Sequence, residues 1–157
     1  MNIITLIQDA ITALNHNAEV NIFEKSRDEN EALEYIVPQI VIFPDWTSRV
    51  KDANLQLQEN RVYNIVFKTQ DENDNSDADS SKSYNDSTSV DRIEDMATLA
   101  NSVFRWINNN IDSYSLNKPL EWSSPSPILR ENNGTMSGVE IKLTANFLGD
   151  FICNYGL

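Results

Sequence analysis

The sequence has very little of the residues from which common catalytic and metal sites are built. Its 157 residues include one cysteine, Cys153, and one histidine, His16. A single cysteine excludes an intramolecular disulfide and a multi-cysteine metal site, and a single histidine excludes a zinc site made of several imidazoles. The four glycines form neither a phosphate-binding loop nor a dinucleotide fingerprint. The residues therefore predict no enzyme, no resident metal and no cofactor.

Basic residues and long hydrophobic runs are also scarce. There are 12 bases against 24 acids, giving a net charge of −12. This excess of negative charge disfavours adhesion to nucleic-acid backbones and to anionic membranes. No run approaches the ~18 apolar residues that would cross a bilayer. The first ten residues lack a basic leader and a small-residue cleavage site, so we expect no secretory signal.

What is present is ordinary globular material. Hydrophobic residues make up 40% of the chain and aromatic residues 9%, enough to fill a core. A chain of this length is typical of one domain, so we expect residues 1–157 to form a single unit.

The first half predicts one helix and three strands. Apolar residues recur at three- and four-residue spacing between Ile3 and Leu14, which indicates an amphipathic helix. Strands are expected at Glu19–Lys25, at Gln39–Phe43 and, with clear alternation, at Leu55–Lys68. Pro44 predicts a bend or a sheet edge, because proline cannot donate to a strand ladder.

Residues 70–88 are strongly polar and contain almost nothing able to fill a core. The segment contains one base, Lys82, and six acids, which are Asp71, Glu72, Asp74, Asp77, Asp79 and Asp86. Such a segment cannot offset its own ordering cost by burial, so we expect a projecting acidic loop within the domain.

This acidic stretch also suggests a calcium loop. Asp71, Asn73, Asn75 and Asp77 have the spacing of the first ligands of such a loop. However, Ser76 stands where glycine makes the sharp turn, and Lys82 stands where glutamate supplies two oxygens. A solvated loop is therefore favoured over a calcium site.

The second half predicts a long helix followed by an antiparallel pair of strands. Apolar residues form a helical stripe from Ile93 to Ile111, with Thr88 or Ser89 as the N-cap. An edge strand interrupted by two prolines is expected at Leu120–Arg130, then a turn at Asn133-Gly134 and an alternating strand at Val139–Phe147. The predicted fold is α+β in the order α-β-β-β-α-β-β, with both helices on one face of a mainly antiparallel sheet.

Three segments resemble a known group of proteins. They are VPQIVIFPDWTSR, VDRIEDMATLANSVFRWINNNI and LEWSSPSPILRENNGTMSGVEIKLTANF, with Gly138 preceding the alternating strand. In pattern and order they are similar to small structural proteins of tailed phages that infect Bacteroidetes, including crAss-like phages. The likeness covers residues 35–68 and 90–148, and the acidic stretch at 70–88 is not part of it. Those proteins resemble tail-terminator and neck proteins, which build rings between the portal and the tail.

The resemblance implies a function carried out by shape. We expect a virion protein without catalytic residues, assembled in the host cytoplasm into a homo-oligomeric ring, a hexamer or a dodecamer. Neighbouring portal, neck or tail proteins would be its partners, and DNA would pass through the lumen without sequence recognition. An acidic lumen suits such a conduit because it repels phosphates over a Debye length of about 8 Å.

Two other classes of protein stay open. The net charge of −12 also suits a soluble acidic adaptor or inhibitor that binds a basic protein. A small hydrolase using paired carboxylates is the third, although no two of the acids stand out. Trp106 is either a residue at the rim of the core or an interface anchor. The candidate interface residues are Asp71, Asp74, Asp77, Asp79, Trp106, Phe151 and Tyr155.

Overall fold

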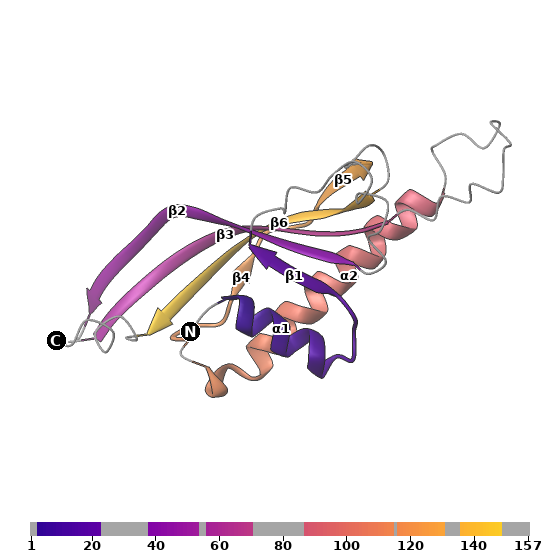
Figure 1. Cartoon of the computed structure of the whole chain (residues 1–157). Coiled ribbons are helices and arrows are strands. Elements are labelled where there is room, and N and C mark those ends of the chain that lie inside the picture. The colour runs from indigo at the N-terminus through magenta and orange to yellow at the C-terminus, as the bar shows by residue number, and fades with distance from the viewer. Residues whose placement is uncertain are drawn as a thin grey trace, which may run out of the picture.

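The computed structural model describes residues 3–22, 38–53, 56–70, 87–114, 116–130 and 136–148. In these ranges the chain forms two α-helices, a short 3-10 helix and six strands (Figure 1). In chain order they are α1 (Ile3–Ala13), β1 (Glu19–Ile22), β2 (Gln39–Ala53), β3 (Gln56–Gln70), α2 (Ser87–Asn109), η1 (Ile111–Ser113), β4 (Glu121–Trp122), β5 (Ser126–Arg130) and β6 (Met136–Leu148).

The six strands form one sheet in the order β1-β2-β3-β6-β4, and β5 pairs with β6 as well. β1 lies parallel to β2, and all the other pairs are antiparallel. The predicted α+β class and mainly antiparallel sheet are therefore confirmed, and the predicted order of elements is matched approximately.

Two elements differ from the sequence prediction. The strand that begins at Gln39 does not end before Pro44 but continues to Ala53. Its neighbour β1 ends opposite Ile42, so Pro44 lies past the described pairing on that side, where a proline is tolerated. The expected edge strand at 120–130 is two short strands, β4 and β5, separated by Ser123–Pro125.

Two predicted features lie mainly outside the described residues. One is the acidic loop at 70–88, of which only Gln70, Ser87 and Thr88 are placed in strand or helix. The other is the turn at Asn133-Gly134.

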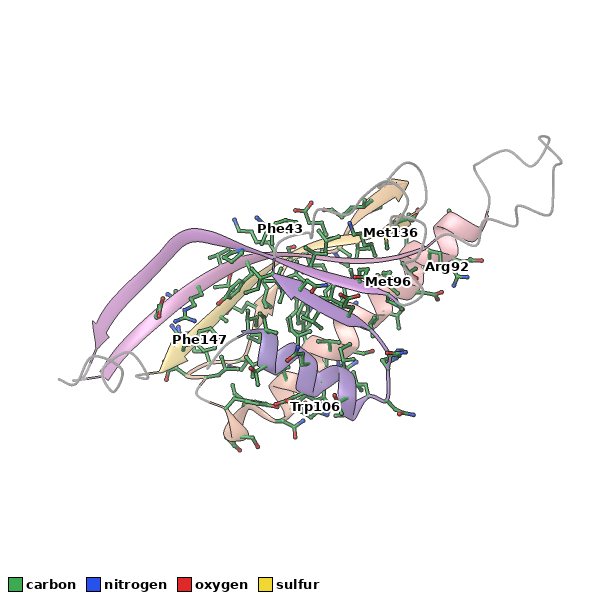
Figure 2. All side chains as sticks on the ribbon, in the orientation of Figure 1. Phe43, Arg92, Met96, Trp106, Met136 and Phe147 are labelled. Atoms are coloured by element: carbon green, nitrogen blue, oxygen red, sulfur yellow. The ribbon has the colours of Figure 1, made fainter. Side chains whose placement is uncertain are left out.

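The main core lies between the sheet and the two helices. Along β3, Tyr63, Ile65 and Phe67 are buried on this side, because alternate residues of a strand point to one face. The stripe of α2 covers them, and the ring of Phe104 meets the ring of Phe67 edge-on with 5.7 Å between centroids. Figure 1 shows both helices beneath the same face of the sheet, and Figure 2 shows Met96 of α2 directed into this layer.

The connection after α2 is attached to that helix by hydrogen bonds. The side chain of Asn108 donates to the Leu120 carbonyl (3.2 Å) and accepts from the Leu120 amide (2.6 Å). The indole of Trp122 donates to Asn101 (3.0 Å) and its ring lies 5.3 Å from that of Phe104. Together these contacts hold β4 against the helical layer.

Within the described ranges, no helix is both long enough and apolar enough to cross a membrane.

Candidate subunit interface

Strands β2 and β3 continue past the helices through residues 45–53 and 56–62, with β6 paired to β3 as far as Gln58, and we call this projection the arm. Figure 1 shows it extending away from both helices to one end of the molecule. The pairing of β2 with β3 runs from Gln39 opposite Lys68 to Ala53 opposite Gln56, close to the tip. At ~3.3 Å per residue, the seven residues of β3 from Gln56 to Val62 give the arm a reach of about 20 Å.

The arm bends near its base. Asp45 pairs with Val62 and Arg49 pairs with Asn60, so three residues of β2 stand against one residue of β3. Such a bulge locally increases the twist of the strand pair and redirects the chain. The direction of the arm is therefore set by residues 46–48 of the chain itself.

β6 lies along most of the arm on its other side, opposite residues 58–62 of β3. It pairs with β3 from Met136 opposite Gln70 as far as Leu148 opposite Gln58, beyond the helical layer. Leu116 forms an isolated bridge with Phe147, and the Asn117 amide donates to the Asn146 carbonyl (3.0 Å). The base of the arm is thus held between several backbone segments.

Arg61 is the central side chain at this base. Its guanidinium pairs with Glu59 at 2.8 Å and its carbon Cζ lies 4.9 Å from the centroid of the Phe147 ring. The side chain of Glu59 is only 16% exposed, so it depends on this partner for charge compensation. Figure 2 shows Phe147 near the end of β6, where the arm leaves the body. One cation therefore links two strands at the point where the core ends.

Burial and charge shift two pKa values at this cluster. The hydrogen bond to Glu59 is the main cause that raises the pKa of Arg61 above its ordinary value, so its charge is permanent. Burial raises the pKa of Tyr63, whereas its hydrogen bond with Arg61 acts in the opposite direction and lowers that pKa. Since Tyr63 is only 6% exposed, the cluster joins the arm directly to the buried core.

The opposite face of the arm base carries an amide pair. Asn146 of β6 donates from Nδ2 to Oδ1 of Asn60 on β3, its cross-strand partner. Asn146 is buried, and its own Oδ1 has no hydrogen-bond partner in the described part of the chain. This amide pair binds the same two strands as the arginine cluster but from the other side.

One long edge of the sheet lies on the arm. Among the described strands, β1 pairs with β2 only at residues 39–42, and β3 pairs with it on the other side as far as Ala53. Edge strands present backbone groups to solvent and are templates for pairing with another chain. The β2 side of the arm is therefore a candidate surface for contact with a second molecule.

Of the predicted interface residues, only Trp106 lies within the described ranges. It is partly buried against the core, with its ring 6.3 Å from that of Tyr114, and Figure 2 shows it at the rim of the helical layer. Partial burial is compatible with both interpretations, a rim residue and an interface anchor. The remaining ones lie outside the described residues: Asp71, Asp74, Asp77, Asp79, Phe151 and Tyr155.

The sequence analysis did not find the arm or its base. The alternation of Leu55–Lys68 indicated a strand, yet nothing placed Arg61 beside Phe147, 86 positions later in the chain. A hairpin at this place could have been predicted from Asn54, a common turn residue that lies between two segments compatible with β-structure.

The described residues include no group of three or more His, Cys, Asp and Glu side chains placed to hold a metal ion. Comparison with protein-family models and with curated proteins gives no match for this chain.

Proposed function

We propose that this chain is a structural subunit of a homo-oligomeric ring in the neck or tail terminator of a tailed phage. The observation that carries the proposal is the arm, whose strands run past both helices to one end of the molecule. A strand edge that projects from the body can pair with a neighbouring molecule. Repetition of one such contact around a closed ring makes a weak contact collectively strong.

The phage setting rests on sequence and charge. Residues 35–68 and 90–148 resemble small phage structural proteins in pattern and order. The net charge of −12 suits a conduit through which DNA moves without being held. In this proposal the protein is part of the virion, its partners are portal, neck or tail proteins, and it carries out no chemical reaction.

The ring proposal is tested by measuring the mass of the particles that the purified protein forms. We expect purified protein to form a discrete species of several copies as its concentration rises, seen by light scattering and as rings in electron micrographs. The protein should also be present in purified virions at the copy number of one ring. A chain that stays monomeric at every concentration and is absent from particles would contradict the proposal.

The second candidate function is an acidic adaptor that binds a basic protein. The exposed acids at the start of α2, Asp91, Glu94 and Asp95, favour it together with the overall charge. Neutralising Asp71, Asp74, Asp77 and Asp79 to Asn should then abolish capture of a basic protein such as lysozyme. Ring formation that survives these changes would favour the first proposal.

A further inference from the structure

The two ends of the molecule differ in charge as well as in shape. The arm contains as many bases as acids, so the entire net charge of −12 lies elsewhere in the chain. Its bases are Arg49, Lys51 and Arg61, and its acids are Asp45, Asp52 and Glu59. Because Glu59 is paired with Arg61 at the base, the charge available for a neighbour lies further out.

The positive part of the arm coincides with its unpaired edge. Residues 46–51 of β2 include two bases and no acid. The same residues lie beyond the end of β1, with β3 as their only paired strand among those described. This segment, which we call the basic edge, therefore combines local positive charge with a strand edge open to another molecule.

The opposite end of the molecule is acidic. β3 runs from the tip of the arm to Gln70 at this end, and α2 begins there (Figure 1). Asp91, Glu94 and Asp95 are exposed on its first turns, and the ion pair seen there joins Arg92 to Asp95 at 3.3 Å. Figure 2 places Arg92 at the far end from Phe147. In sequence, the residues joining β3 to α2 add six further acids and one base.

From these observations we infer that copies of this chain associate head to tail, with the basic edge of one copy lying against the start of α2 of the next. The inference rests on the proposed ring and names its contact. A single copy cannot bring the two surfaces together, since the arm points away from its own α2 start. A contact between two different surfaces propagates from copy to copy and closes into a ring when the rotation allows it.

The physical reason for this contact between copies is local charge complementarity. Two molecules of charge −12 repel each other at long range, but salt screens this repulsion beyond about 8 Å at physiological ionic strength. At contact distance the signs of the touching segments decide, and here the basic edge would lie against the acidic first turns of α2. Pairing of opposite charges also fixes which surface is chosen as the partner.

The test is a charge exchange between the two surfaces. The edge variant carries Arg49→Glu and Lys51→Glu, and the helix variant carries Asp91→Lys and Glu94→Lys. The control variant carries Lys118→Glu and Lys142→Glu, two exposed lysines of the body whose reversal changes the net charge as much as the edge variant does. Self-association is measured by sedimentation velocity, and folding of every variant by circular dichroism and thermal melting.

We expect the edge and helix variants each to self-associate about tenfold or more weakly than the control, while keeping its melting temperature. An equimolar mixture of the two should recover assemblies of the wild-type mass, because each basic surface again meets an acidic one. The chain carrying both pairs of changes should recover assembly on its own.

Other outcomes overturn the inference. Recovery that stops at a one-to-one dimer would mean that arms pair with arms. Rings that form equally well in all variants would leave the ring proposal standing and remove this contact. A wild-type chain that is monomeric throughout would remove both.

Discussion

At the scale of single residues, Gly138 marks the closest approach of two strands. A Cβ built at this position would lie 1.9 Å from the Phe67 carbonyl oxygen and 2.7 Å from the Lys68 Cα. Both are backbone atoms of β3 in the middle of the sheet, so no flexible side chain can move aside. Gly138, the third residue of β6, is thus required by the spacing of β3 and β6.

We therefore expect Gly138→Ala to destabilise the protein by about 1–3 kcal/mol or more, since β3 and β6 must separate to admit one methyl group. Urea unfolding measures this as a lower midpoint. The control is Lys142→Ala, an exposed position of the same strand, where the change should stay within about 0.5 kcal/mol. Equal midpoints for the two variants would show that the strands separate freely at Gly138.

Tyr63 gives the base of the arm a dependence on pH. Burial raises the pKa of its hydroxyl above the ordinary value of 10.0, so the folded chain keeps the proton while the unfolded chain loses it. The contribution to stability is complete below pH 10 and is lost as the pH rises toward the folded pKa.

Accordingly, the wild type should lose about 1 kcal/mol relative to Tyr63→Phe between pH 8 and pH 11. Urea unfolding of both proteins at the two pH values measures the difference. Parallel losses in the two proteins would show that Tyr63 does not cause the effect.

At the scale of elements, the attachment of β4 to α2 depends on one side chain that binds backbone. Asn108 makes two hydrogen bonds to Leu120 and thereby fixes the chain that returns from the helix to the sheet. Asn109 is the next residue of the same helix and is exposed. The two asparagines therefore form a matched pair.

Asn108→Ala should cost about 1–3 kcal/mol, because it leaves the amide and carbonyl of Leu120 without these partners. Asn109→Ala should be neutral or slightly stabilising, since alanine is the better helix former. Thermal melting of the two variants, with the fluorescence of Trp122 as a local reporter, makes the comparison. A loss of similar size at both positions would point to the helix end in general and not to the bond with Leu120.

The helices and strands differ in how far they could be predicted from the sequence. The stripe of α2 and the alternation of β6 were predictable, because each pattern reflects burial against one core. The outer part of β2, DWTSRVKDA, has no such alternation, since it continues past the helices whose cover would impose one. β4 is only two residues long, too short for any period.

The candidate site escaped prediction for a related reason. The contact of Arg61 with Phe147 depends on the register of β3 against β6, which pairs Glu59 with Phe147. Register is a property of two strands together, and neither strand alone contains it. Trp106 stood out in the sequence because it lies off the main stripe of its helix, and the structure places it at the rim.

At the scale of the whole molecule, the proposed ring assigns the contact with a neighbour to the arm and most of the core to the body. On β2 and β3 the described core ends at Ile42 and Tyr63, whereas on β6 it includes Ala145 and Phe147, opposite Arg61 and Glu59. The fold is therefore expected to survive a shorter arm at a cost in stability, whereas assembly is not.

Replacing residues 50–59 by Asn-Gly joins Arg49 to Asn60, which already face each other across the hairpin, through a turn typical of such pairs. Arg61 keeps its place over Phe147, and the loss of the Glu59 contact and of the pairing of residues 58 and 59 with β6 should cost about 1–3 kcal/mol of stability. We expect a folded protein whose melting curve stays cooperative but whose self-association, measured by light scattering, is at least about tenfold weaker. A shortened chain that still forms the wild-type assembly would show that copies meet through the body, whereas one that fails to fold would show that the arm belongs to the folding unit.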